Sequence, residues 1–125
     1  LLGLLEDPKF LFDTVATVIE AELEAVPMDV LLKLLDENTP PDRVLAMIPA
    51  EYINKIKNAI GDVDRDSLMK IRTLAVKYVN TRNVLLFLRK NNMELYGVFI
   101  NHPNGKKWLE NFINYVLQNL TTILG

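Results

Sequence analysis

Three acidic residues at alternating positions, Asp62, Asp64 and Asp66, have the most suggestive metal-binding spacing in this chain of 125 residues. Carboxylates at positions 1, 3 and 5 between two helices are the first ligands of an EF-hand calcium loop. Such a loop also needs a glycine at position 6 and an acid at position 12, where this chain has Ser67 and Thr73. The sequence therefore predicts no metal site, and we expect Asp64 or Asp66 to cap the following helix.

Other groups that could do catalytic chemistry are few. The chain has one histidine and no cysteine, which excludes thiolate zinc sites, disulfides and a cysteine nucleophile. His102 has no carboxylate at a spacing that would make it a general base. No phosphate-binding loop, dinucleotide fingerprint or nucleophile elbow is found. We therefore expect a protein that is not an enzyme and that binds neither a metal nor a cofactor.

The elements that position these residues are predicted to be short helices. Apolar residues recur every three or four positions between Pro, Asn and Asp breaks, and no run has the two-residue period of a strand. The predicted fold class is all-α, a compact bundle of about seven or eight helices forming one domain over residues 1–125. Because the sequence begins with Leu1, we expect this domain to be part of a longer chain. The helices are expected at residues 8–25, at a segment ending near 38, at 42–48, 49–60 and 65–79, after a cap at Thr81, and at 93–100 and 106–124.

Two segments 54 residues apart are similar in sequence. Residues 29–34 (Asp-Val-Leu-Leu-Lys-Leu) align with residues 83–88 (Asn-Val-Leu-Leu-Phe-Leu), and the same offset aligns Asn38 with Asn92. Shared leucines and valines arise easily between amphipathic helices, whereas coincident helix breaks are less common. One interpretation is therefore a duplicated helical unit, and the other is two unrelated helices of similar composition.

The net charge of −2 is the sum of two unlike halves. Residues 1–64 hold thirteen acids and five bases, whereas residues 65–125 hold nine bases and three acids. Such polarity steers charged partners and favours head-to-tail association, with a strength that falls as salt rises.

The bases of the second half are candidates for docking an acidic protein surface, a nucleic acid or an anionic lipid surface. The bases that we place on exposed helix sides are Lys70, Lys77, Arg82, Arg89 and Lys90. Nucleic acid is disfavoured because the chain is acidic overall and has no basic motif interleaved with aromatic residues. The plainer alternative is a solvated helix face that pairs with the acidic half.

The final predicted helix carries no charge after Glu110. Its outer side presents Asn111, Asn114 and Gln118, where a surface helix usually carries lysine and glutamate. A partner or a second copy of the chain would cover such a face, and a neutral but solvated face is the alternative. Trp108 at its start is expected to be buried in the core.

An alternative function is suggested by a resemblance. Residues 24–27 (Glu-Ala-Val-Pro) with 30–35, and residues 85–88 (Leu-Leu-Phe-Leu) with 93–97, resemble repeats of insect allergen-related helical proteins that carry lipids. The helix lengths between these blocks differ from that pattern. The resemblance implies a carrier of a lipid or another apolar ligand. The preferred hypothesis is a non-catalytic domain for protein–protein interaction or self-assembly. No stretch of the sequence approaches the roughly 18 apolar residues that a transmembrane helix needs.

Overall fold

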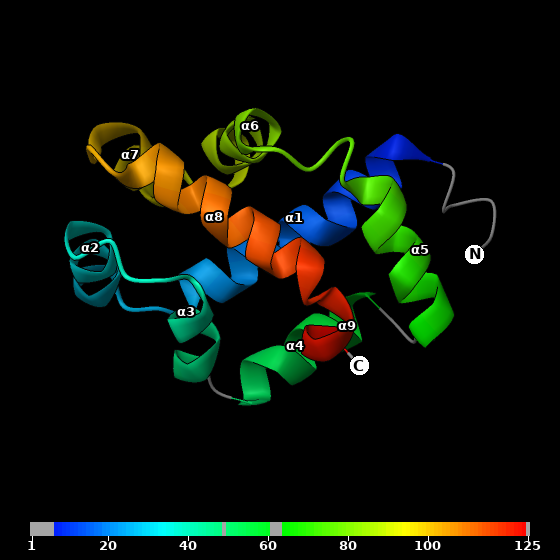
Figure 1. The fold of residues 1–125 in the computed structure, drawn as a ribbon. Coiled ribbons are helices and arrows are strands. Elements are labelled where there is room, and N and C mark those ends of the chain that lie inside the picture. The colour runs from blue at the N-terminus through cyan, green and yellow to red at the C-terminus, as the bar shows by residue number, and fades with distance from the viewer. Residues whose placement is uncertain (1–6, 49, 61–63, 125) are drawn as a thin grey trace.

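The chain folds entirely into helices and loops within the residues described by the computed structural model, which are 7–48, 50–60 and 64–124 (Figure 1). The prediction of an all-α fold is confirmed over these residues. Their helices are α1 (Pro8–Glu24), α2 (Met28–Asp36), α3 (Asp42–Met47), α4 (Ala50–Ile60), α5 (Arg65–Ala75), α6 (Thr81–Asn91), α7 (Met93–Asn101), α8 (Gly105–Gln118) and α9 (Leu120–Leu124).

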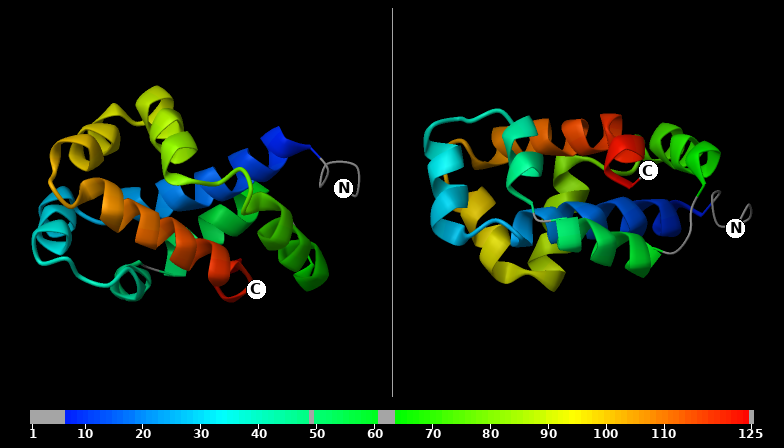
Figure 2. Two further views of the ribbon diagram at one scale, coloured as in Figure 1. Left: turned by 45° about the horizontal axis from the view of Figure 1, so that its top comes forward. Right: turned by 90° about the horizontal axis from the view of Figure 1, so that it is seen from below.

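Helices α1 and α8 cross near the centre of the molecule, and the other helices surround them (Figures 1 and 2). Helix α1 packs against α3, α4, α5, α6 and α8. Its side chains at Leu11, Val15, Ile19 and Leu23 belong to one continuous hydrophobic core that also includes Phe112 of α8. Burial of this apolar surface is the main favourable contribution to folding.

Two predicted helix starts are confirmed. The side chain of Asp7 accepts a hydrogen bond from the backbone N–H of Lys9 at 3.0 Å, and Pro8 occupies the first helical position. Asp64 caps α5, because its side chain accepts from the N–H of Ser67 at 2.7 Å. Asp62, the first residue of the calcium-like spacing, lies outside the described residues.

Helix α5 ends earlier than predicted and α6 has a different cap. The sequence predicts a helix up to residue 79, but α5 ends at Ala75. Asn80, rather than Thr81, is the cap of α6, since its side chain accepts from the N–H of Asn83 at 2.9 Å. The side-chain Nδ2 of Asn83 in turn donates to the carbonyl oxygen of Tyr78 at 2.9 Å. These two asparagines satisfy backbone groups that a continuing helix would have paired, so the chain turns here.

The predicted C-terminal helix is also interrupted. Residue 119 separates α8 from α9, which brings the described helices to nine rather than seven or eight. The Nδ2 of Asn119 donates to the carbonyl oxygen of Tyr115 at 2.9 Å, and this oxygen also accepts from the Asn119 backbone N–H at 3.0 Å. The break allows Leu120 and Ile123 to turn into the core. The Asn119 N–H is shared between the carbonyl oxygens of Tyr115 and Val116, at 3.0 and 3.2 Å, so the last turn of α8 tightens where the helix ends.

The capping of α6 gives a stability prediction. Replacing Asn80 by alanine is expected to lower the free energy of unfolding by about 1 kcal/mol, because the first turn of α6 loses its side-chain acceptor. Thr81→Ala is the matched control and should change stability by less than half as much. Urea unfolding followed by circular dichroism measures both. Equal losses in the two variants would contradict the assignment of the cap to Asn80.

The helix bounds repeat at the offset found in the sequence. Shifted by 54 residues, the bounds of α2, α3 and α4 become 82–90, 96–101 and 104–114. The first two ranges lie inside α6 and α7, and the third overlaps most of α8. Burial agrees as well, since Leu31 and its counterpart Leu85 are buried whereas Leu32 and its counterpart Leu86 are exposed. These agreements favour the interpretation of two related helical units.

Two hydrogen bonds, which together we call the clamp, join the end of α2 and the loop after it to the start of α8. The indole Nε1 of Trp108, which is buried as expected, donates to the carbonyl oxygen of Thr39 at 2.8 Å. The Nδ2 of Asn104 donates to the carbonyl oxygen of Leu35 at 3.0 Å. Each bond spans 69 positions of the sequence, so the loop after α2 is fixed to the start of α8.

His102 lies beside this clamp. Its Nδ1 accepts the backbone N–H of Asn104 at 3.0 Å, which places the ring proton on Nε2. Nε2 lies 2.6 Å from Oδ1 of Asp36, to which it donates. Nε2 therefore joins the end of α7 to α2, and Nδ1 holds the turn that follows α7.

Candidate docking groove

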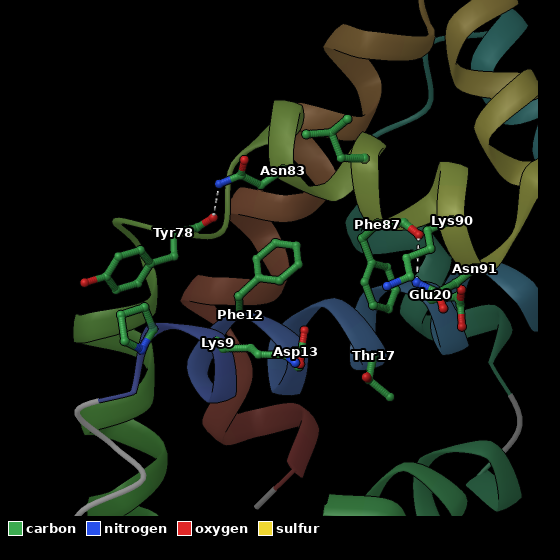
Figure 3. Close-up of a pocket in the computed structure, with 12 residues that line it drawn as sticks. Lys9, Phe12, Asp13, Thr17, Glu20, Tyr78, Asn83, Phe87, Lys90 and Asn91 are labelled. Carbon is green, nitrogen blue, oxygen red and sulfur yellow. Dashed lines mark hydrogen bonds between the residues drawn. The ribbon is translucent and has the colours of Figure 1, made fainter.

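An open groove of about 860 Å³ lies between α1 and α6 (Figure 3). Helix α1 supplies one wall, α6 supplies the other, and Tyr78 from the turn before α6 lies at one end. Val84, Leu85 and Leu88 of α6 are buried in the core, whereas Leu86 and Phe87 of the same helix line the groove. Its lining therefore combines partly buried aromatic rings with the polar side chains of two helix surfaces.

The middle of the groove is apolar. Phe12 of α1 and Phe87 of α6 meet edge to face, with ring centroids 5.9 Å apart and an interplanar angle of 76°. Leu86 lines the same groove and is 52% exposed. Two aromatic rings and a leucine on a concave surface are typical of sites that receive an apolar side chain.

The edges of the groove carry charges of both signs. Lys9, Asp13 and Glu20 lie on the α1 side, and Lys90 lies on the α6 side (Figure 3). None of these four side chains forms an ion pair with another described residue. Lys9, Asp13 and Lys90 are consequently available to charged groups of a ligand.

Burial changes the titration of one of these acids. The pKa of Glu20 is raised, first by partial burial of its carboxyl group and second by the negative charge of Glu24. Its Oε2 atom is buried without a hydrogen-bond partner among the described residues. Glu20 therefore takes up its proton at a higher pH than an exposed glutamate does as the solution is acidified.

Helix α6 presents a basic outer face beside the groove, which we call the α6 face. It consists of Arg82, Leu86, Arg89 and Lys90, all of which are exposed. Arg82, Leu86 and Arg89 are spaced four and three residues apart, so they lie on one side of the helix. Residues 81–91 contain no acidic residue, so this face has a uniform positive charge around an exposed leucine.

The other predicted partner-binding residues are exposed but divide into separate places. Lys70 lies in α5, and Lys77 lies in the turn that follows α5 rather than in the helix itself. Figure 1 shows α5 at the right-hand edge and α6 along the top, so the predicted bases do not form a single face. Only Arg82, Arg89 and Lys90 among them belong to the α6 face.

The uncharged side of α8 is exposed along Asn111, Asn114 and Gln118. Its end meets α5, because Nη1 of Arg72 donates to the carbonyl oxygen of Gln118 at 3.4 Å. A shallow hollow at this junction includes Val76, which is 58% exposed. The end of α8 is thus joined to α5, and α8 does not line the groove.

The sequence interpretation missed the groove itself. Phe12 and Phe87 are 75 positions apart, and their contact follows from the packing of α6 on α1 rather than from any local pattern. One signal was available, because residues 84–88 are five consecutive apolar residues and a helix cannot bury all of them on one side. Leu86 is the member of that run most exposed in the structure.

Comparison with protein-family models, curated proteins and solved structures finds no match to this chain. No group of three or more potential metal ligands occurs within the described part of the chain. Among the described helices, none has the combination of length and apolarity needed to cross a membrane. The candidate function therefore depends on the geometry of the groove and the α6 face.

Proposed function

We propose that this protein is a non-catalytic helical docking domain that binds an acidic, amphipathic segment of a protein through the groove and the α6 face. The observation that carries the proposal is the exposed Leu86, which links the aromatic groove to a helix side bearing Arg82 and Arg89. Apolar anchors in a groove with charges around them are the usual means by which helical domains bind an amphipathic helix.

The distribution of charge favours an acidic occupant. Helix α6 contributes three bases and no acid, and none of the three is paired with a described residue. Complementary charges at the edge of an interface mainly accelerate association and select the partner, whereas the buried apolar centre supplies most of the affinity. The aromatic pair Phe12–Phe87 would receive the apolar side chains.

A peptide probe tests this proposal. A fluorescent helical peptide with leucines on one side and glutamates beside them should bind in a polarisation assay, and a scrambled peptide of the same composition should not. Leu86→Glu and Arg89→Glu should each weaken binding about tenfold or more. Lys106→Glu is the matched control, because it makes the same charge change at an exposed position of α8. Equal binding by the two peptides, or equal effects of Arg89→Glu and Lys106→Glu, would overturn the proposal.

A carrier of apolar ligands is the second candidate, favoured by the aromatic groove. Its volume of about 860 Å³ is of the size that drug-sized ligands occupy. Native mass spectrometry after mild purification distinguishes the two functions. Stoichiometric lipid that is lost in Leu86→Glu would support the carrier, whereas an empty protein that binds the acidic peptide would support the docking domain.

A further inference from the structure

We propose that the partner of the α6 face is α2 of a second copy of this chain. This inference rests on the proposed docking function and names its occupant. It starts from the outer side of α2, which is the counterpart of α6 at the offset of 54 residues. Two buried leucines of α2, Leu31 and Leu34, correspond to buried leucines of α6, but the two helices differ in the charge of their exposed residues.

Helix α2 presents an acidic outer side, which we call the α2 face. It consists of Asp29, Leu32 and Asp36, which are spaced three and four residues apart and are all exposed. Leu32 is 39% exposed, and the Asp36 side chain is 70% exposed although it also contacts His102. Lys33 is the base of this helix, and Glu37 at its end adds another exposed acid.

The two faces match in chemistry and in dimension. In each, a leucine lies between two charges of one sign that are seven residues apart, or about 10 Å along a helix axis. Aspartates 29 and 36 can therefore pair with Arg82 and Arg89 at the same time, while Leu32 contacts Leu86. Two ion pairs on either side of an apolar contact form a complementary interface, in which the leucines exclude water and the charges set the register.

One molecule cannot make this contact with itself. Helices α2 and α6 lie at separate places on the surface, with α7 between them (Figures 1 and 2). The contact must therefore join two molecules, and each molecule offers both faces. An interface between unlike faces of identical chains can extend to further copies or close into a ring.

A charge-swap experiment tests the proposal by sedimentation velocity at low salt. The wild-type chain should sediment faster as its concentration rises, and added salt should reduce this effect. The variant Arg82→Glu/Arg89→Glu carries two acidic faces, and the variant Asp29→Arg/Asp36→Arg carries two basic faces. Each variant alone should remain monomeric, and an equimolar mixture of the two should regain the larger species.

Controls separate assembly from folding. Asp36 also holds His102, so Asp29→Arg alone is measured as a variant that keeps this contact, with at least a tenfold weaker association expected. Circular dichroism checks that each variant is folded. A concentration-independent monomer for the wild-type chain, or a mixture of swapped variants that stays monomeric, would overturn the inference. Binding of the acidic peptide in that case would still support the docking function, so the two proposals fail separately.

Discussion

Replacing Glu22 by glutamine is expected to raise the free energy of unfolding above pH 8 by on the order of 4 kcal/mol. The residue is fully buried in the central helix α1, and both of its carboxylate oxygens lack a hydrogen-bond partner among the described residues. Burial raises its pKa to about 8, because the surrounding protein disfavours the charged form. Glutamine has nearly the same shape and carries no charge at any pH.

The direction of the pH dependence follows from proton binding. Between the ordinary pKa of 4.5 and the folded value of about 8, the folded protein holds a proton that the unfolded chain has released. Stability therefore falls as the pH rises through this window, and the loss is complete above about pH 8. Near pH 4, the Glu22→Gln variant and the wild-type protein should be almost equally stable.

Urea unfolding at intervals from pH 4 to pH 9 measures this effect. Glu51→Gln is the matched control, because it makes the same substitution at an exposed position. Glu22→Leu should stabilise the protein over the same window, since it removes the buried polar group altogether. Parallel stability curves for the wild-type protein and Glu22→Gln would show that this carboxyl group stays ionised in the folded state.

Replacing Gly105 by alanine is expected to lower the free energy of unfolding by about 3 kcal/mol. Gly105 begins α8, and a Cβ atom there would lie 2.2 Å from the carbonyl oxygen of Phe99 and 2.8 Å from its carbonyl carbon. These are backbone atoms of α7, so no side-chain rotation relieves the overlap. The substitution must push apart two packed helices, or displace the loop that joins them.

The matched control is Gly97→Ala in the middle of α7. A Cβ atom there meets only the side-chain Nδ2 of Asn101, at 3.9 Å. Alanine also restricts the unfolded chain and favours helix, so this variant should gain about 0.5–1 kcal/mol. Thermal unfolding of the two variants under the same conditions makes the comparison. Similar effects at both positions would contradict the close approach of α7 and α8.

The sequence predicted the helical content of the fold because helix signals are local. The Asp7–Pro8 start and the spacing of apolar residues in α1 need no tertiary information. The end of α5 and the break at residue 119 were missed for a physical reason. Asn80 and Asn83 bond backbone groups through their side chains, and Asn119 shares its N–H between two carbonyl oxygens. The residue type alone does not say whether a helix continues through an asparagine.

The candidate site was predicted only in part. Exposure of Arg82, Arg89 and Lys90 follows from helical periodicity, and the structure places all three on one helix. Their separation from Lys70, and the aromatic pair that forms the groove, depend on how α5 and α6 pack against α1. Glu22 was counted only as a charge of the acidic half, since its burial depends on helices that contact α1 from several sides.

The fluorescence of Trp108 can be used to follow formation of the clamp. This residue is the single tryptophan of the chain, and its ring stacks on Phe112 with centroids 5.4 Å apart. Because its indole N–H is bonded to Thr39, its environment is complete only when segments far apart in the sequence have met. Tryptophan fluorescence in stopped-flow refolding should therefore follow the joining of α8 to the loop after α2, whereas far-ultraviolet circular dichroism follows the helices themselves. If the fluorescence signal follows the circular dichroism signal after a delay, the delay measures how long the preformed helices take to join.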